Sequence, residues 1–477
     1  MKNERAAKVQ ATRQAGARRA RAGEGREALG RLRDEFARRG IRRVKVGGFD
    51  VDGVFRGKYL ALDKFWGAAQ GGFGFCDVVF GWDVGDALYD NAKVTGWHTG
   101  YPDTLARIDL STFRVIPWEP ATAAFILDFC EPSGAPLPVS PRQLLQRIDA
   151  RAREQRLRVK CGAEYEFFFF RETPATLHEK GFRDLVPLSP GMFGYSWVRS
   201  SESAALVHAL LDGLADFGVP VEGFHTETGP GVFEAAIAYD DLLPAADKAA
   251  LFKTAVKEIA ARHGLTACFM AKWNEALPGC SGHLHQSVWD LAGERNLFAG
   301  EGGPHGLSAD LAAYVAGQLA LLPELTALAC PTVNSYKRAV PHTWAPTAAT
   351  WGVENRTCAL RVIRPSESAT RVEFRVPGAD MNPYLALAAS VASGLWGLRT
   401  RPELPPPVTG NAYDDGKAKA LPRDLGEAAV ALRDGRAARD LLGAEFVDHY
   451  ARTREWEWNK YRRAVTDWEL ARYFEAV

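Results

Sequence analysis

The chain has 477 residues, enough for about three domains or for one large catalytic domain with a smaller partner. The chain has 59 Lys and Arg residues and 58 Asp and Glu residues, which leaves a formal net charge of +1. The overall charge therefore gives no reason to expect binding to nucleic acid or to an anionic membrane. The seven scattered cysteines form no CxxC pair, which argues against a disulfide framework or structural zinc and favours a reducing cytoplasm.

Residues 1–40 are basic and rich in Arg, Ala and Gly, and they lack an apolar core. We expect a disordered or partly helical extension there. No uninterrupted apolar stretch reaches the roughly 18 residues that span a bilayer, and the N-terminus lacks the apolar region of a signal peptide. The pattern therefore predicts a cytoplasmic protein without a membrane segment.

A small β-rich domain is expected over residues 41–140. The stretch VKVGGFDVDGVFRGKYLAL, from Val44, alternates β-type residues around Asp52-Gly53, which is a signal for a two-residue hairpin turn. The Pro-, Gly- and Ser-containing stretch EPSGAPLPVSP is typical of a linker. The boundary to the next domain is therefore predicted near Pro141.

Residues 141–477 alternate helical and strand patterns. Ser140 is a candidate cap for a helix in SPRQLLQRIDARAREQRL, and a strand follows over 158–170. AADKAALFKTAVKEIAARHG predicts an amphipathic helix that ends at Gly264, and TACFMAKW and GHLHQSVWD predict strands. After a long loop, LGEAAVALRDGRAARDLL predicts a helix. The whole pattern indicates an α+β protein.

Buried carboxylates are the most informative feature. In CGAEYEFFFF, Glu164 and Glu166 share one strand face inside the most apolar run of the chain. Polar groups recur at three other places: Glu227 and Glu234 flank a Gly-Pro-Gly turn, His283 and His285 share one strand face, and Arg371, Glu373 and Arg375 share another. Five carboxylates gathered beside an imidazole repel one another unless divalent cations neutralise them, and this oxygen-dominated donor set suits Mg²⁺ or Mn²⁺ better than zinc.

A second group of residues is cationic. It lies within forty residues and consists of Lys337, Arg338, Arg356, Arg361, Arg364, Arg371 and Arg375. Guanidinium groups match carboxylate and phosphate oxygens, so arginines beside a two-metal carboxylate site indicate phosphoryl transfer from a nucleotide. The chain contains no GxxxxGK[ST] motif, so the nucleotide is not expected in a P-loop.

From about Val44 to its C-terminus the chain resembles the glutamine synthetase family. The resemblance is carried, in family order, by FDVDGVFRGK, AEYEFFFF, the glutamates around GPG, SGHLHQS, CPTVNSYKRAVP, ENRTCALRV and RVEFRVPGADMNPYLALAA. It implies a β-grasp-like N-terminal domain and a catalytic domain whose curved antiparallel, barrel-like sheet is backed by helices. It also implies a homo-oligomer of two stacked hexameric rings, a dodecamer, with active sites between subunits.

The resemblance also implies roles for individual residues. The first metal would be held by Glu166, Glu227 and Glu234, and the second, which binds the ATP phosphates, by Glu164, His283 and Glu373. Arg338 and Arg375 match the arginines that hold glutamate and its γ-phosphorylated form, and Gly279 matches the loop beside that substrate. Arg356 and Arg371 match the clamp on the nucleotide phosphates, supported by Arg361 and His285. For His285 a packing role remains an alternative, as do a solvated side chain for Lys337 and a structural ion pair for Arg364.

The implied reaction has two steps. ATP phosphorylates the γ-carboxylate of L-glutamate, and an amine then displaces phosphate to form a γ-glutamyl amide. The metals and arginines would stabilise the charge that develops in both transfers.

Trp344 is the main departure from the family pattern. Ammonia-using relatives of the bacterial type have a flap glutamate at this place, which helps to take a proton from ammonium. An aromatic wall suits an alkyl, aryl or polyamine substrate instead, so we expect an organic amine. Trp344 as a packing residue away from the site is an alternative.

Three smaller departures concern other loops. Pro278 stands where the family often has Asn, and GFCDVVFGWD replaces the loop that carries an ammonium-binding aspartate from a neighbouring subunit, with Asp77 or Asp83 as possible substitutes. Tyr413 lies near the adenylylation tyrosine of some relatives, but its surroundings differ.

Two alternatives to an amine ligase stay open. One is an ammonia-using glutamine synthetase, which the Glu to Trp change disfavours. The other is a catalytically inactive structural homologue, which the complete set of metal and arginine positions disfavours.

Overall fold

The computed structural model describes residues 27–477, and the chain divides into two compact units. Unit 1 contains the described residues through Gly48, together with Gly57–Phe75 and Thr104–Ala135. Unit 2 contains Phe49–Arg56, Cys76–Asp103 and Pro136–Val477. Residues 1–26 of the expected extension lie outside the described residues, and the domain limits at 40 and 140 remain predictions.

Unit 1 is built on a five-stranded mixed sheet with the strand order β2-β1-β5-β4-β3. Its strands are β1 (Arg43–Phe49), β2 (Phe55–Leu60), β3 (Phe73–Cys76), β4 (Asp103–Val115) and β5 (Thr122–Cys130). Strand β1 runs parallel to β5, β4 runs antiparallel to β5, and helix α2 (Leu62–Gly71) connects β2 to β3. A helix over 27–39 places Phe36 against Phe65 and Phe125, so this stretch contributes to the core of unit 1.

The predicted two-residue turn at Asp52-Gly53 is wrong, because five residues separate β1 from β2. The Asp50 carboxylate accepts hydrogen bonds from the backbone N–H groups of Asp52, at 3.0 Å, and Val54, at 2.9 Å. These side-chain hydrogen bonds stabilise a tip that is longer than a two-residue hairpin turn. Gly53 has φ of +78°, a conformation that glycine adopts without a steric cost.

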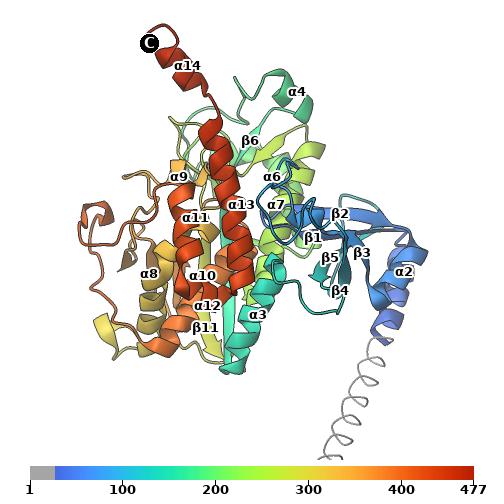
Figure 1. The fold of residues 1–477 in the computed structure, drawn as a ribbon, viewed down its shortest axis with the longest axis horizontal. Helices are drawn as coiled ribbons and strands as arrows, with labels where there is room; N and C mark the ends of the chain where they lie inside the picture. Colours follow the sequence, from blue (N-terminus) through green and yellow to red (C-terminus); the bar gives the residue numbers. More distant parts are fainter. Residues whose placement is uncertain (1–26) are drawn as a thin grey trace, which may run out of the picture. The chain divides into compact units, whose positions relative to one another are not determined.

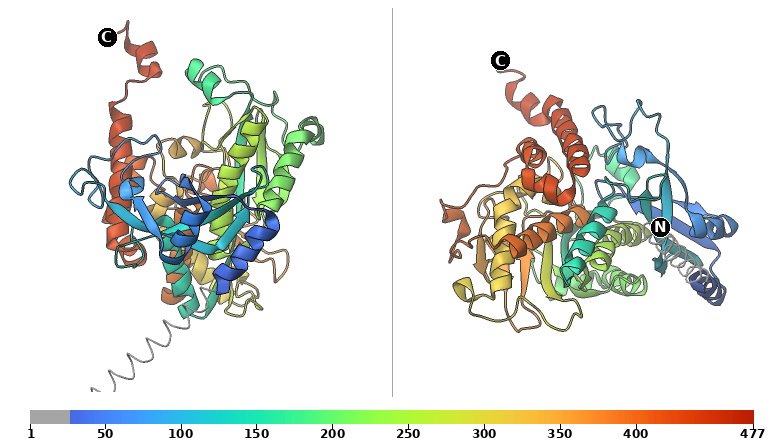
Figure 2. Two further views of the ribbon diagram at one scale, coloured as in Figure 1. Left: turned by 90° about the vertical axis from the view of Figure 1, so that its right-hand side faces the viewer. Right: turned by 60° about the horizontal axis from the view of Figure 1, so that its bottom comes forward.

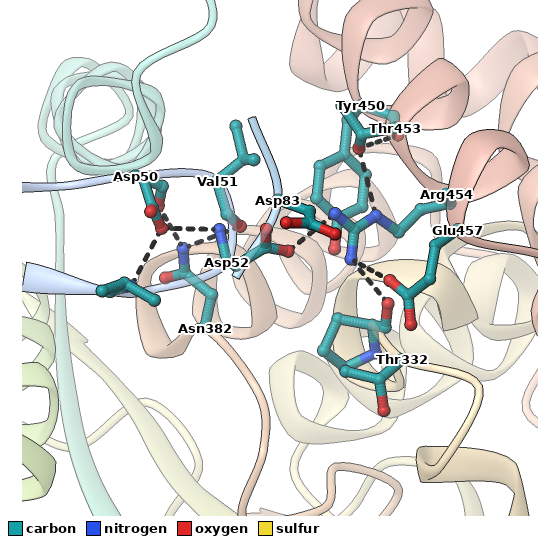
Figure 3. Close-up of polar contacts among 12 residues, drawn as sticks. Asp50, Val51, Asp52, Asp83, Thr332, Asn382, Tyr450, Thr453, Arg454 and Glu457 are labelled. Carbon is teal, nitrogen blue, oxygen red and sulfur yellow. Dashed lines mark hydrogen bonds and ion pairs between the residues drawn. The ribbon is translucent and has the colours of Figure 1, made fainter. Parts of the chain in front are cut away.

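The hairpin tip belongs to unit 2 and is held there by two buried side chains (Figure 3). The Asn382 amide donates to the carbonyls of Asp50 and Val51 at 3.1 and 3.2 Å. The Arg454 guanidinium donates to the Asp52 carboxylate at 2.6 Å. Asn382 also caps the helix that follows it, so the tip is tied to the start of that helix.

The nine-stranded sheet of unit 2 has the order β12-β13-β14-β11-β6-β8-β7, and β9 and β10 pair with β6. Its strands are β6 (Leu157–Phe170), β7 (Val221–Thr226), β8 (Val232–Ile237), β9 (Asp240–Asp241), β10 (Thr266–Cys268), β11 (Gly282–Asp290), β12 (Trp351–Val353), β13 (Leu360–Ile363) and β14 (Arg371–Phe374). All pairs are antiparallel except β12 with β13. The predicted α+β class with an antiparallel catalytic sheet is confirmed.

Unit 2 also contains helices, some of which cover this sheet (Figure 1). They are α3 (Pro141–Glu154), α4 (Pro174–Glu179), α5 (Trp197–Glu202), α6 (Ala204–Asp216), α7 (Leu242–Arg262), α8 (Ala309–Ala329), α9 (Ser335–Arg338), α10 (Pro383–Thr400), α11 (Leu425–Asp434), α12 (Arg436–Leu442), α13 (Ala444–Arg463) and α14 (Asp467–Tyr473). Short 3₁₀ helices cover Asp77–Phe80, Pro304–Gly306 and Ala412–Asp414. Helix α14 extends away from the other helices of unit 2 (Figure 2).

The phenylalanine-rich end of β6 shows why one strand carries both core and polar residues. Tyr165 stacks on Phe252 of α7 at a centroid distance of 5.8 Å, and Phe167 stacks on Phe269 at 5.0 Å. These side chains point to the helix-covered face, whereas the alternate residues Glu164 and Glu166 line a cavity on the other face. The prediction that the FFFF run is core is confirmed, since all four rings are buried.

Helix α8 is the one helix among residues 27–477 whose length and apolar composition would suit a membrane span, with a mean hydropathy of 1.4. However, 89% of that window is buried within the protein, as is usual for the central helix of a globular core.

The other predicted helices and strands are confirmed only in part. The strand predicted at 158–170 and the helix ending at Gly264 are present, but TACFMAKW forms a strand over only three residues. Ser140 stands at the helix start without a side-chain capping bond. The helix predicted over LGEAAVALRDGRAARDLL is interrupted at Gly435, whose ψ of 113° is extended.

Candidate active site

The register of the large sheet places the predicted carboxylates and imidazoles side by side. Glu166 on β6 pairs with Glu234 on β8, and Glu164 pairs with His283 on β11. His285 of β11 pairs in turn with Glu373 on β14. Cβ atoms of such partners lie about 4.5–5.5 Å apart, so segments far apart in sequence form one polar face.

A cavity of about 470 Å³ lies over this face, and it brings together all of the predicted metal, substrate and ATP residues. It is lined by Glu164, Glu166, Glu227, Glu234, Gly279, His283, His285, Arg338, Trp344, Arg356, Arg361, Arg371, Glu373 and Arg375, together with Tyr195, Thr228, Val232, Pro278, Ser281 and Thr343. Trp344 therefore lies at the cavity, and its alternative as a distant packing residue is not supported by the structure.

One candidate ligand group surrounds Glu164. Ligand atoms of Glu164, His285 and Glu373 lie within 4.8 Å of one another. His283 Nδ1 also lies 3.5 Å from Glu164 and 3.4 Å from Glu373. Burial alone would raise the pKa of Glu164, but hydrogen bonds from His283 and His285 outweigh it and hold the pKa well below its usual value. His285 thus belongs to the same cluster as His283.

The second group contains a histidine that sequence reasoning missed. Ligand atoms of His225, Glu227 and Glu234 lie within 4.8 Å of one another, and His225 Nε2 lies 3.3 Å from Glu227. The Tyr195 ring stacks on His225 at 4.3 Å. The available signal was spacing, since His225 stands two residues before Glu227 at the end of a strand, where alternate residues share a face.

The donor set fits hard divalent cations. Burial, reinforced by Glu164 and Glu166, raises the pKa of Glu234 to about 10, so the protein alone cannot hold all these carboxylates ionised at neutral pH. Burial and the nearby Arg375 lower the pKa of His283, which keeps its imidazole neutral. Its Nε2 is buried without a hydrogen-bond partner. Carboxylates with neutral imidazole are ligands for Mg²⁺ or Mn²⁺.

Three of the arginines lie on strands β13 and β14 or directly after β14. Arg375 forms a short ion pair with Glu373, and Arg361 donates to the other oxygen of that carboxylate at 3.0 Å. Burial would raise the pKa of Glu373, but His283 and Arg375 lower it to about 2. Arg371 Nε donates to His285 Nδ1 at 3.2 Å, which orients that ring toward Glu164.

Arg338 is buried beside the loop that carries Gly279. Its guanidinium donates to the carbonyl of Val376 at 3.1 Å. A Cβ at Gly279 would lie 2.5 Å from the Ala271 carbonyl oxygen and 2.9 Å from Arg338 Cγ, so only glycine fits there. The close approach of this loop to Arg338 therefore requires glycine at position 279.

A second cavity of about 410 Å³ shares Glu164, His285 and Arg371 with the first. It is also lined by Lys160, Tyr239, Ser287 and Trp289, and the Lys160 ammonium lies 3.8 Å above the Trp289 ring. The two cavities thus meet at one ligand cluster, and the second offers aromatic walls.

Some predicted residues lie elsewhere. Arg364 pairs with Glu301 at 3.3 Å, which supports its structural alternative, and Lys337 is exposed above the Tyr461 ring at 5.5 Å. Asp77 accepts a hydrogen bond from Thr95, and the Asp83 carboxylate accepts from the backbone of a local turn. None of these four lines the main cavity.

The chain is similar to known ligases over most of its length. The family model described as glutamine synthetase, catalytic domain, matches residues 138–473. A type-1 glutamine synthetase 2 of Dictyostelium discoideum is 49% identical over 91% of this chain and 84% of its own length. A glutamate–isopropylamine ligase of Pseudomonas sp. is 39% identical over 95% of this chain and 99% of its own. A solved structure of a GmaS/ADP complex aligns with a TM-score of 0.80 and 30% identity, covering 92% of this chain and 98% of that one.

Proposed function

The chain belongs to the glutamine synthetase family and is an ATP-dependent carbon–nitrogen ligase of the glutamate–amine type, and from that premise we propose that its amine substrate is organic. The single observation that carries this proposal is Trp344. Its ring is 63% exposed at the cavity that also holds the candidate metal ligands and Arg338. An indole offers an apolar or cationic alkyl group a surface that a bare ammonium ion does not need.

Each cavity has a proposed occupant. L-Glutamate would lie in the main cavity with carboxylates on Arg338 and Arg375, whose forks match carboxylate geometry. ATP would lie in the second cavity, with its base near Tyr239 and Trp289 and its phosphates toward Arg356 and Arg371. The ADP complex reported for the structural relative supports a nucleotide in this fold.

Divalent cations, Mg²⁺ or Mn²⁺, would be held by two sets of ligands. One set is Glu166, Glu227 and Glu234, with His225 as an added candidate, and the other is Glu164, His283 and Glu373, with His285 beside them. Bound there, the cations would neutralise phosphate and carboxylate charge during transfer.

The proposed chemistry has two displacements. A γ-carboxylate oxygen of glutamate attacks the terminal phosphorus of ATP, the bond to the bridging oxygen breaks, and ADP leaves. The amine nitrogen then attacks the acyl phosphate carbon, forms the amide bond and loses a proton while inorganic phosphate departs. Arg338 and Arg375 hold the substrate in place in both steps, and Arg356, which is exposed at the cavity, faces the transferred group.

An ammonia-using glutamine synthetase is the second candidate. The Dictyostelium relative, at 49% identity, carries that name, whereas the isopropylamine ligase has 39% identity. The two candidates share every step before the amine attacks. Their difference therefore lies in the residues around the nitrogen, and Trp344 is the one that favours the organic amine.

The test is phosphate release from the purified protein with ATP, Mg²⁺ and L-glutamate. Ammonium is compared with isopropylamine, ethanolamine and polyamines, and each product is identified by mass. We expect turnover with at least one organic amine and poor turnover with ammonium. Efficient turnover with ammonium alone would contradict the proposal, and Glu373→Gln serves as the control for contaminating ATPase.

An inactive homologue would release no phosphate with any amine.

We also propose a cytoplasmic homo-oligomer, a dodecamer of two hexameric rings, as the family resemblance implies. Light scattering coupled to gel filtration tests the oligomer, and a monomeric mass would contradict it.

A further inference from the structure

The loop that carries Trp344 has an unfavourable backbone conformation. This Trp344 loop, residues 339–350, holds His342 at φ of +67° and Trp344 at +56°. Residues other than glycine pay a steric cost in this left-handed region, so they keep it only where surrounding contacts fix the backbone. The orientation of Trp344 therefore depends on what holds its loop.

The loop is held by a segment about seventy residues later in the chain. This strap, residues 411–421, pairs with the end of the loop: Ala349 N–H donates to the Lys419 carbonyl at 2.8 Å, and Leu421 N–H donates to the Thr347 carbonyl at 3.0 Å. An isolated bridge joins Ala348 and Ala420 between them. These bonds fix the loop beyond Thr347 but not the turn that carries Trp344.

Tyr413 of the strap reaches that turn. Its hydroxyl donates to the Ala345 carbonyl at 3.0 Å, and its ring lies 5.2 Å from the His342 ring. The backbone of Thr343 and Trp344 also hydrogen-bonds to this hydroxyl, so the turn is held from the strap by Tyr413 at several points. Burial raises the pKa of Tyr413, so the hydroxyl keeps the proton that it donates.

The start of the strap and Gly410 before it are bonded to the two residues that flank Arg356. Ala412 N–H donates to the Thr357 hydroxyl at 2.9 Å, and the Asn355 amide donates to the Gly410 carbonyl at 2.9 Å. Arg356, between these two residues, accepts a hydrogen bond at its carbonyl from Arg375 Nε at 3.1 Å. Tyr413 thus connects the arginine side of the cavity to its tryptophan side.

We propose that Tyr413 is a positioning residue for the amine step, because its hydroxyl holds the Ala345 carbonyl and so fixes Trp344 at the cavity. The kinetic part of this inference rests on the proposed function, since it needs an amine that contacts Trp344. The structural part does not, since it concerns only the order of the Trp344 loop.

The test compares Tyr413→Phe with the wild type and with Tyr59→Phe. The control removes a hydroxyl that bonds to Glu119 in unit 1. Hydrogen exchange is followed in peptides covering 339–350. In Tyr413→Phe we expect exchange about fivefold faster, the factor that corresponds to one hydrogen bond of typical net strength, and no change in Tyr59→Phe. Unchanged exchange in Tyr413→Phe would overturn the inference.

Steady-state kinetics provide the second readout, with the amine varied at saturating ATP and glutamate, and ATP varied at saturating amine and glutamate. We expect the KM for the organic amine to rise about fivefold in Tyr413→Phe, while kcat and the KM for ATP stay near the wild type. A purely structural role would alter all three constants together. Faster exchange with an unchanged amine KM would overturn the assignment to the amine step. A wild-type protein without organic-amine turnover would instead refute the proposed function, and the exchange result would still be readable.

Discussion

Glu166 on β6 and Glu234 on β8 oppose each other directly across an antiparallel ladder, two carboxylates at a position where like charges destabilise a sheet. The Glu166 carboxylate accepts a hydrogen bond from the backbone N–H of Ser281 at 2.7 Å, which keeps it oriented into the cavity. Glu234 is instead protonated at neutral pH, because burial and the nearby Glu164 and Glu166 raise its pKa to about 10. The protein without cations thus keeps one of the two groups neutral, and a bound cation would allow both to ionise.

A dependence of stability on pH and on cations follows. Without cations, folded Glu234 keeps a proton that the unfolded chain releases near its ordinary pKa of 4.5, so the free energy of unfolding falls as the pH rises from there to about 10. Cation binding needs ionised carboxylates. We therefore expect Mg²⁺ or Mn²⁺ to raise Tm more at about pH 8.5 than at about pH 6.

The variant Glu234→Gln separates this effect from nonspecific ion binding. The Gln amide does not ionise, so the variant without cations should be more stable than the wild type at alkaline pH. The variant should also lose most of the cation-dependent rise in Tm. The exposed residue Glu403 provides a matched control, Glu403→Gln, in which the cation response should stay as in the wild type. An equal cation response in both variants would contradict the assignment.

Trp344 leads to a prediction about substrate choice. Removing the ring in Trp344→Ala should raise the KM for an organic amine about 5- to 30-fold, which corresponds to about 1–2 kcal/mol of aromatic and cation contact. Trp344→Phe should recover most of it. Trp344→Glu, which introduces the residue found in ammonia-using relatives, should increase turnover with ammonium. The assay is phosphate release with each amine.

The control for this series is Trp97, a tryptophan that is 82% exposed and lines neither cavity. Trp97→Ala should leave the amine KM unchanged. If Trp344→Ala behaved like Trp97→Ala, the ring would have no part in amine recognition.

The sequence allowed much of the large sheet to be predicted, because a carboxylate inside an apolar strand is costly and therefore conspicuous. Glu164 and Glu166 marked the cavity face of β6 for this reason, and Tyr165 and Phe167 marked the helix-covered face. The turn at Asp50 could not be predicted in this way. The longer tip is held by the Asp50 carboxylate and also by Asn382, and the contact from Asn382, more than three hundred residues away, leaves no local pattern.

The site was predicted least well where a residue type is common in ordinary cores or loops. His225 was missed because a single histidine beside a strand end more often packs than binds. The left-handed backbone of Trp344 has no signal in a stretch without glycine, since distant contacts such as that from Tyr413 hold it. These features depend on tertiary contacts, which propensity and spacing do not encode.

Gly279→Ala is expected to impair glutamate binding. Its Cβ would overlap the Ala271 carbonyl and Arg338 Cγ, so the loop or the arginine must shift. Misplacing a substrate-holding group by a fraction of an ångström weakens a two-point carboxylate contact, and we expect the KM for glutamate to rise about 10- to 100-fold.

The matched control is Gly67→Ala, where a Cβ meets nothing within 4 Å and α2 gains a better helix former. Its steady-state constants should equal those of the wild type. A glutamate KM in Gly279→Ala that also equals the wild-type value would show that glutamate does not depend on this loop.

The ion pair between Arg454 and Asp52 should be a large contributor to the stability of unit 2. The guanidinium and carboxylate lie 2.6 Å apart with side chains only 1% and 6% exposed, and Arg454 also donates to the Pro331 carbonyl at 2.7 Å (Figure 3). Asp52→Ala leaves a buried cation without its closest partner, which typically costs about 3–5 kcal/mol. We expect the lower end of that range, because Glu457 remains 3.3 Å from the guanidinium.

Chemical denaturation with a double variant tests whether the cost comes from the orphaned charge. Arg454→Met in the Asp52→Ala background removes the unpaired cation and replaces it with an apolar chain that packs against Tyr450, which the guanidinium now covers at 4.9 Å. The double variant should therefore be more stable than Asp52→Ala alone. Arg423 pairs with Glu427 at the surface, where the arginine side chain is 84% exposed, so Arg423→Gln should leave the denaturation midpoint unchanged. If the double variant were less stable than Asp52→Ala, Arg454 would stabilise unit 2 mainly through its other contacts, and the buried ion pair would not be the dominant interaction.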